Sequence, residues 1–172
     1  MEREEPVLYL ERLRRGDVDA YQDLVFAHGA RLLGAAERLG HTPHEAEDLV
    51  QDVFLALVRS ADRFEGRSQI FTWLYRVLLN RHADMVRRKK QARSALTAAP
   101  ESVAPPEPGG EDRLRGALRQ LREPEQRVLF LRYFESLPYE DIARILQAPL
   151  GSVHSLAFHG LRRLRALMED VS

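Results

Sequence analysis

The sequence of 172 residues contains no cysteine, no long apolar run and no net charge. Without cysteine the chain cannot form disulfides, Cys-ligated zinc sites, iron–sulfur clusters or a thiol nucleophile, which favours a reducing, cytoplasmic setting. Its longest apolar runs, such as Val53–Val58, fall far short of the ~20 residues that a membrane span requires. The charged residues 1–6 lack the apolar character of a secretory signal. We therefore expect a cytoplasmic protein without direct membrane insertion.

Motifs of the common enzyme classes are also absent from the sequence. It contains no G-x-x-x-x-G-K-[ST] phosphate loop, no G-x-G-x-x-G dinucleotide fingerprint and no H-E-x-x-H zinc motif. His41 and His44 lie near several acids, but two histidines in a helix-capping turn without a second ligand cluster are weak evidence for a metal site. We expect neither an enzyme nor a metal, cofactor or small-molecule substrate.

The composition changes once, between about residues 92 and 111, where Ala, Pro, Ser and Gly dominate and large apolar residues are scarce. Such a segment is typical of a linker. On either side, apolar residues recur at helical spacing rather than in alternation. The sequence therefore predicts an all-α protein of two small helical domains, residues 1–93 and 112–172, joined by a flexible linker over residues 94–111.

The balance of 26 basic and 26 acidic residues hides two segments of opposite charge. Residues 41–56 contain four carboxylates and no Lys or Arg, whereas residues 76–93 contain seven Lys or Arg and one Asp. Local charge governs binding more than the total does. The two segments therefore predict two different partners.

The acidic segment lies on a predicted helix. Thr42 is suited to the N-cap, Pro43 to the first helical position, and Glu45 completes a capping box. Glu45, Asp48 and Asp52 share one face of this helix, which supplies no Lys or Arg of its own. Two interpretations follow: a solvated face with first-turn acids favoured by the helix dipole, or a docking surface for a basic protein partner.

A second predicted helix, residues 71–90, combines aromatic and basic side chains. Unpaired bases stack on aromatic rings, and phosphates pair with cations, so Phe71, Trp73 and Tyr75 beside the basic run 87–90 indicate a site for single-stranded nucleic acid. The alternative places the aromatic rings in the core and leaves the basic run as a solvated helix end.

The second module has the layout of a helix-turn-helix. One helix is expected from Pro124, a short helix over residues 138–146, a turn over 147–151 and a longer helix over 152–168. The second helix of such a motif enters the major groove of DNA. Gly160 interrupts the last helix at a cost of ~1 kcal/mol relative to Ala, for which the sequence offers no reason.

Together these segments resemble the extracytoplasmic-function group of bacterial RNA polymerase sigma factors, which consist of regions two and four. The matching segments are AEDLVQDVF at 46–54, FTWLYR at 71–76 with Asn80, the basic run to Lys90, EQRVLFLRYF at 125–134, YEDIA at 139–143 and GSV at 151–153. They follow the family's order over nearly the whole chain.

The resemblance implies an alternative sigma factor that directs promoter-specific transcription by core RNA polymerase and is regulated by an anti-sigma factor. The acidic helix would bind the β′ clamp helices, and the β flap is a second expected contact. The implied polymerase contacts are Glu47, Asp48, Leu49, Gln51, Asp52 and Phe54. The remaining alternatives are a sigma-like protein whose second module mainly binds a regulatory protein, or a helix-turn-helix repressor.

The resemblance also implies that residues 64–90 meet the −10 element, where a base is captured as the strands separate. Extracting a base costs a few kcal/mol and stacking returns ~1–3 kcal/mol per base, so binding energy can drive melting. The expected base readers are Arg67, Ser68 and Gln69. Further expected contacts to the −10 strand are Trp73, Tyr75, Arg76, Asn80, Arg81, Arg87, Arg88, Lys89 and Lys90.

The last helix departs from the family's pattern, in which Lys, Ser and Arg face the −35 element. Positions that are usually basic hold His154, Leu156, His159 and Leu161, which should weaken or change −35 recognition. The expected −35 contacts are Ser152, His154, Ser155, His159, Arg162 and Arg163. Alternatively, Leu156, Phe158 and Leu161 form an apolar docking surface for an inhibitor or activator.

Overall fold

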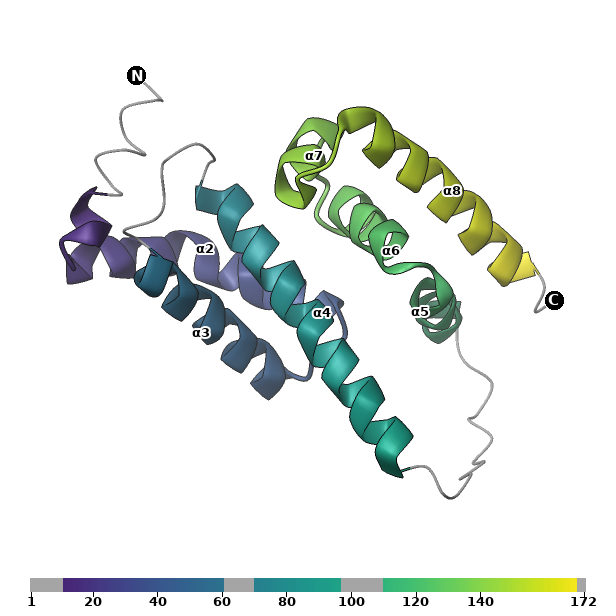
Figure 1. Ribbon diagram of the computed structural model, residues 1–172, viewed down its shortest axis with the longest axis horizontal. Helices are drawn as coiled ribbons and strands as arrows, with labels where there is room; N and C mark the ends of the chain where they lie inside the picture. The colour runs from purple at the N-terminus through teal and green to yellow at the C-terminus, as the bar shows by residue number, and fades with distance from the viewer. Residues whose placement is uncertain (1–10, 61–69, 97–109, 170–172) are drawn as a thin grey trace. The chain divides into compact units, whose positions relative to one another are not determined.

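The computed structural model describes residues 11–60, 70–96 and 110–169, and within these ranges it contains helices and no strands. This confirms the all-α prediction. The chain divides into two compact units, residues 1–91 and 92–172. Figure 1 shows the helices in order: α2 (Val18–Arg38), α3 (Pro43–Ser60), α4 (Ile70–Leu96), α5 (Gly110–Gln120), α6 (Glu123–Leu129), α7 (Tyr139–Leu146) and α8 (Leu150–Glu169).

Polar caps begin α2 and α3, the second as the sequence predicts. Asp17 Oδ1 accepts hydrogen bonds from the backbone N–H groups of Asp19 and Ala20, at 3.0 and 3.2 Å, at the start of α2. The N–H of Thr42 donates to the Glu45 carboxylate at 3.0 Å, and the N–H of Glu45 donates to Thr42 Oγ1 at 3.3 Å. The Thr42–Glu45 cap lies at the turn between α2 and α3, whereas the Asp17 cap lies at the opposite end of α2.

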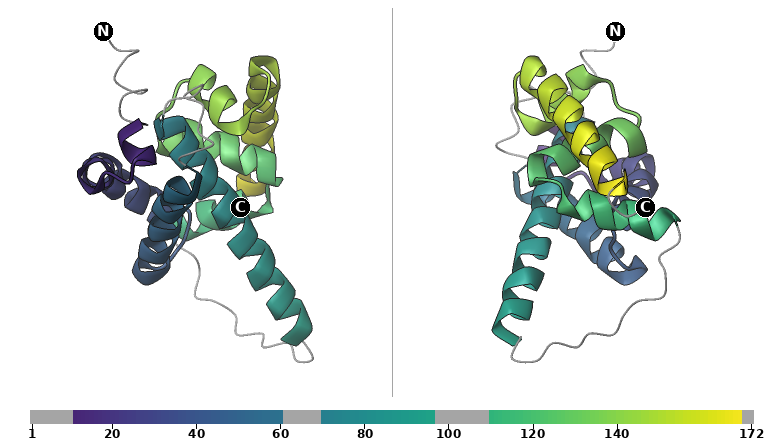
Figure 2. Two further views of the ribbon diagram at one scale, coloured as in Figure 1. Left: turned by 60° about the vertical axis from the view of Figure 1, so that its left-hand side comes forward. Right: turned by 90° about the vertical axis from the view of Figure 1, so that its right-hand side faces the viewer.

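The first unit is built around the apolar faces of α2, α3 and the N-terminal half of α4. The side chains of Leu32, Val53, Leu57, Leu74 and Leu78 are fully or almost fully buried in it. Both views in Figure 2 show the C-terminal half of α4 projecting away from α2 and α3. Its residues from Arg87 to Ser94 are exposed. The basic segment is therefore a solvent-exposed continuation of a helix whose N-terminal half is packed in the core.

In the second unit α8 packs along α6, with contacts to α7 and α5 as well (Figure 1). Leu131, Ile142 and Val153 fill the space between these helices and are fully buried. A π-helical segment, Phe130–Phe134, continues α6. The helix-turn-helix is present as α7 and α8, and α8 begins at Leu150, slightly earlier than predicted.

Gly160 of α8 has a structural reason that the sequence did not reveal. It is buried against α6, where an added Cβ would lie 3.2 Å from Leu129 Cδ1 and 3.3 Å from Glu125 Cβ. These separations are shorter than ordinary carbon–carbon contacts. The missing side chain therefore allows α6 and α8 to approach closely.

Helices occupy both ends of the expected linker, because α4 extends to Leu96 and α5 begins at Gly110. Residues 97–109, the middle of that linker, lie outside the described residues. None of the described helices is both long and apolar enough to span a bilayer.

Candidate functional site

The α3 side chains expected to meet a partner mostly lie at the surface. Exposed among them are Glu47, Asp48, Gln51 and Asp52. On the same helix, Nε2 of the exposed His44 imidazole lies 3.8 Å from Asp48 Oδ2. Leu49 is only 2% exposed and packs into the core, so its expected contact with a partner is corrected to a supporting role. Phe54 is half-buried.

Glu45 differs from the exposed carboxylates of α3 because a cation from α4 holds it. Its Oε1 accepts a hydrogen bond from Lys89 Nζ at 2.5 Å, and its Oε2 accepts one from the N–H of Thr42. Hydrogen bonding to Lys89, with the Thr42 N–H second, lowers the pKa of Glu45 to about 2. α3 carries no Lys or Arg before Arg59 in its last turn, and Lys89 of α4 supplies the cation that pairs with Glu45 in the first turn of α3.

A pair of histidines joins the α2–α3 turn to α4. Nε2 of His41 and Nδ1 of His82 are 2.9 Å apart, so one ring donates and the other accepts. Burial lowers the pKa of His41, which favours the neutral ring. Within the described ranges no group of three or more His, Asp or Glu residues is arranged to hold a metal ion.

One face of α4 collects several of the expected contacts to the −10 strand. Four of them follow the spacing i, i+3, i+7 and i+14, which places them on one side of the helix: Trp73, Arg76, Asn80 and Arg87. Trp73 and Arg76 are half-buried, and Asn80 and Arg87 are exposed. The structure therefore brings these four side chains into one row.

Tyr75 does not belong to this surface. Its side chain is 0% exposed, and its ring centroid lies 4.6 Å from that of Phe71. A base cannot stack on it in this structure, so the expected contact to the −10 strand is corrected to a core position. Arg31 of α2 places its guanidinium 4.5 Å from the centroid of the Phe71 ring, a contact that the sequence analysis missed.

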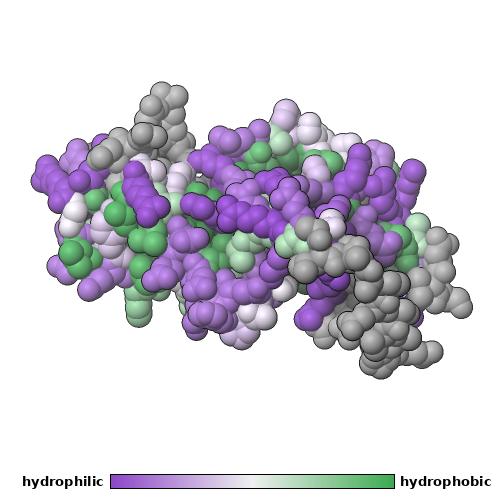
Figure 3. Space-filling model, turned by 60° about the horizontal axis from the view of Figure 1, so that its bottom comes forward, coloured by the Kyte–Doolittle hydropathy of each residue, from purple (hydrophilic) through white to green (hydrophobic). Residues whose placement is uncertain are grey.

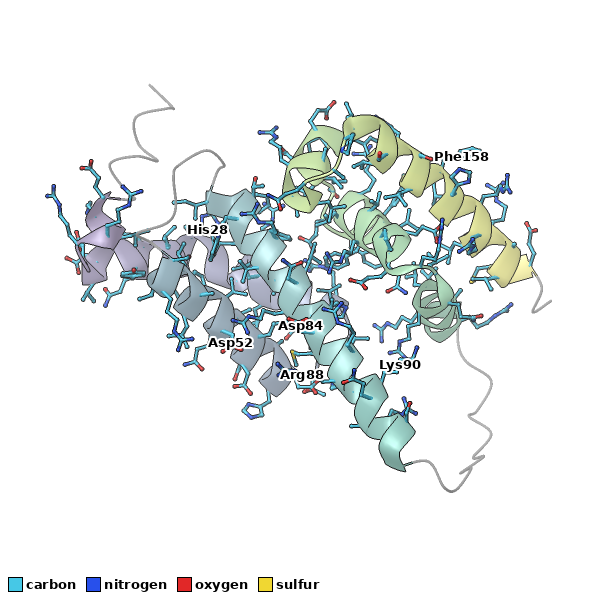
Figure 4. The ribbon with its side chains drawn as sticks, in the orientation of Figure 1. His28, Asp52, Asp84, Arg88, Lys90 and Phe158 are labelled. Atoms are coloured by element: carbon cyan, nitrogen blue, oxygen red, sulfur yellow. The ribbon has the colours of Figure 1, made fainter. Side chains whose placement is uncertain are left out.

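The basic run of α4 is not uniform. Lys89 is paired with Glu45, and Arg87 is paired with Asp84. Arg88 and Lys90 are exposed, and Figure 4 shows them on different sides of α4. Arg81 is exposed about two turns before Arg88. The expected base readers Arg67, Ser68 and Gln69 lie outside the described residues.

All the α8 side chains expected to meet the −35 element are exposed: Ser152, His154, Ser155, His159, Arg162 and Arg163. Arg163 nevertheless donates to Glu125 Oε2 of α6 at 3.2 Å. Glu125 has a fully buried side chain and also pairs with Arg122 at 2.5 Å, which is the main cause of its lowered pKa. The structure thus gives Arg163 a role between α6 and α8 in addition to the expected phosphate contact.

Apolar side chains also reach the surface of α8. Phe158 is 63% exposed and Leu161 is 40% exposed, whereas Leu156 is half-buried. Figure 4 shows Phe158 on the outer side of α8. On the one face that Figure 3 draws, hydrophobic residues lie scattered among mostly hydrophilic ones.

Comparison with known proteins gives two family matches, "Sigma-70 region 2" over residues 18–92 and "Sigma-70, region 4" over residues 111–164. The chain is 33% identical to the RNA polymerase sigma-H factor of Pseudomonas aeruginosa, with 87% of this chain and 86% of that one aligned. It is 30% identical to the ECF RNA polymerase sigma-E factor of Haemophilus influenzae, with 94% and 92% aligned.

A solved structure is similar over most of the chain. It is that of the sigma factor RpoE of Bartonella quintana in complex with the anti-sigma factor NepR. The alignment has a TM-score of 0.62 and 28% sequence identity, and it covers 88% of this chain and 97% of that one.

Proposed function

The chain belongs to the extracytoplasmic-function group of RNA polymerase sigma factors, and from this premise we propose how its surfaces divide the work. Sigma factors are not enzymes; they bind core RNA polymerase and direct it to promoters. We assign polymerase binding to the exposed face of α3, contact with the −10 element to α4, and contact with the −35 element to α8. Since these partners are in the cytoplasm, we place the protein there.

The exposed acidic face of α3 is the observation that carries this division. Glu47, Asp48 and Asp52 project from a helix whose opposite face is fixed in the core by Val53 and Leu57. These carboxylates are exposed, and the one contact described among them, His44 with Asp48, lies at the surface, so a basic helical partner can pair with them without breaking a buried ion pair. The β′ clamp helices of polymerase are the partner that the family implies.

Exchanging charge on this face tests the assignment. Asp48→Lys with Asp52→Lys should abolish binding to core polymerase, because attraction becomes repulsion, while exposed substitutions change stability by only about 0.5 kcal/mol. Affinity would be measured with full-length chain and core enzyme. The matched control is Asp23→Lys with Glu37→Lys, which makes the same charge change at exposed positions of α2. Unchanged affinity of the α3 variant would refute the assignment.

Contact with the −10 element rests on the row of Trp73, Arg76, Asn80 and Arg87 along α4. The half-buried Trp73 offers part of an aromatic ring for stacking, and the two Arg side chains offer charge for phosphates. Melting then draws its free energy from stacking of extracted bases rather than from a nucleotide cofactor.

Binding of an anti-sigma factor is the second part of the proposal. The similar Bartonella quintana sigma factor was solved in complex with one. In this chain, Phe158 and Leu161 leave apolar area on the outer face of α8 where DNA-binding helices usually carry cations. This observation favours a second candidate function, in which region four binds a regulatory protein more strongly than it binds DNA.

The two functions of α8 can be separated by substitution. Phe158→Ser with Leu161→Ser should leave promoter binding by the holoenzyme unchanged if α8 uses its polar side chains on DNA. The same pair should weaken capture of a cognate anti-sigma factor if the apolar area is its docking site. Loss of promoter binding with intact regulator binding would reverse this assignment.

A further inference from the structure

Three side chains from three segments of the second unit form one stack at the start of α8. The imidazole of His154 lies with its centroid 4.3 Å from the ring centroid of Tyr139, at an interplanar angle of 44°. Arg132 places its guanidinium carbon 4.9 Å from the same tyrosine centroid. The stack runs from the middle of the π-helical segment Phe130–Phe134, through the first residue of α7, to the first turns of α8.

At the inner end of this stack, the Arg132 side chain is held by a hydrogen bond to the backbone. Arg132 Nη1 donates a hydrogen bond to the carbonyl oxygen of Leu137 at 3.1 Å, and Leu137 is buried. Arg132 and Tyr139 are themselves half-buried. The Tyr139 ring is therefore only partly open to solvent, with the hydrogen-bonded Arg132 guanidinium beside it.

The outer end of the stack is an exposed imidazole. His154 follows Val153, whose side chain is fully buried, so its Cα is firmly placed while its ring faces solvent. A solvent-exposed histidine without a neighbour samples several rotamers. The Tyr139 ring restricts His154 to the rotamers that keep the two rings in contact.

From this arrangement we propose that Tyr139, braced by Arg132, is a positioning residue that holds the His154 imidazole ready to read one base of the −35 element. The inference rests on the proposed contact of α8 with that element. A neutral imidazole carries one donor and one acceptor nitrogen, so it can address the major-groove edge of a single base. A fixed ring compensates for the absence of a longer basic side chain at this position, because less freedom is lost on binding.

The test is the base preference of the holoenzyme at each −35 position. Core polymerase with full-length chain would transcribe a promoter library in which only the −35 element is randomised. His154→Ala should flatten the preference at one base pair by roughly tenfold, the discrimination expected of a good base contact. Tyr139→Ala should flatten it at the same base pair, and the double variant should be no worse than His154→Ala alone. Tyr139→Phe should retain the preference because it keeps the ring.

A merely structural role for Tyr139 predicts a different pattern. Loss of packing would lower transcription from all library members alike, or would add to the effect of His154→Ala, and either result would overturn the proposal. If Tyr139→Ala unfolds the domain, Tyr139→Leu keeps the apolar volume without the aromatic ring and must give the same single-position loss.

Different results would refute the positioning of His154 by Tyr139 and the contact of α8 with the −35 element. A wild-type holoenzyme that initiates specifically but shows no preference at any −35 position would refute the DNA contact of α8, and with it the role of Tyr139. A preference that survives both His154→Ala and Tyr139→Ala would refute only the positioning of His154.

Discussion

Gly160 sets the distance between α6 and α8, and its cost in helix propensity is offset by the packing that it permits. Replacing it with Ala gains up to ~1 kcal/mol of helix propensity but places a methyl group 3.3 Å from Glu125 Cβ, which the α6 backbone holds in place. Overpacking of this kind costs about 1–3 kcal/mol. Gly160→Ala should therefore lower the free energy of unfolding by about 1 kcal/mol, measured by chemical denaturation.

Gly116 provides the matched control for that substitution. It also lies inside a helix, α5, but an added Cβ would have no atom within 4 Å. Gly116→Ala should therefore stabilise the second unit. Stabilisation by both substitutions would contradict the packing account of Gly160.

Glu125 should make the second unit sensitive to acid. The Arg122 guanidinium, with Arg163 contributing, lowers the pKa of this buried carboxyl below its ordinary value of 4.5. The stability that its charge supplies is present above about pH 4.5 and is lost as the pH falls through the folded-state pKa. Glu125→Gln should cost about 1–3 kcal/mol at neutral pH and flatten the decline of unfolding free energy below pH 4.5. An unchanged pH profile would show that the pair contributes nothing.

Single residues were predictable from the sequence where local chemistry decides their role. The predicted cap at Thr42 is correct because a cap depends only on its neighbours in the chain. The roles of Leu49 and Tyr75 were wrong because a family motif mixes residues that bind a partner with residues that hold the motif in place. Which of them are buried depends on how α2, α3 and α4 pack, and spacing along one helix does not determine that.

The basic residues of helix α4 differ in whether a carboxylate of another helix pairs with them. Lys89 is neutralised by Glu45, whereas Arg88 extends from the projecting half of the helix (Figure 4). A Lys or Arg that neutralises a DNA phosphate releases the counterions condensed on that phosphate, and a side chain already paired with a carboxylate does so less readily. The sequence predicted the basic run but not this division, because Glu45 is distant from Lys89 in the chain.

This division predicts unequal effects on the salt dependence of open-complex formation. Arg88→Ala should reduce the slope of log K against log salt concentration by about 0.7–0.9, the value of one phosphate contact. Lys89→Ala should reduce it less, because Lys89 must first leave Glu45. Arg119→Ala on α5, an exposed Arg of the second unit, is the control. Equal reductions for Arg88 and Lys89 would contradict the unequal states seen in the structure.

The whole chain was easier to predict than its parts. Helical periodicity and one change of composition were enough for the all-α fold, and the ordered motifs of two modules were enough for the family. Contacts between helices, such as Arg31 with Phe71 and Arg163 with Glu125, could not be predicted because each joins segments whose spacing carries no signal. The residues expected to read the −10 base, Arg67, Ser68 and Gln69, remain a prediction from family resemblance.

Specific initiation by the reconstituted enzyme is the most direct test of the division of work proposed here. Purified core RNA polymerase would be given a genomic DNA library with and without the full-length chain, and the 5′ ends of the transcripts would be mapped. We predict a small set of start sites that require the chain, share −10 and −35 elements, and disappear with Asp48→Lys and Asp52→Lys but not with Asp23→Lys and Glu37→Lys. Start sites identical to those of core enzyme alone would contradict the account.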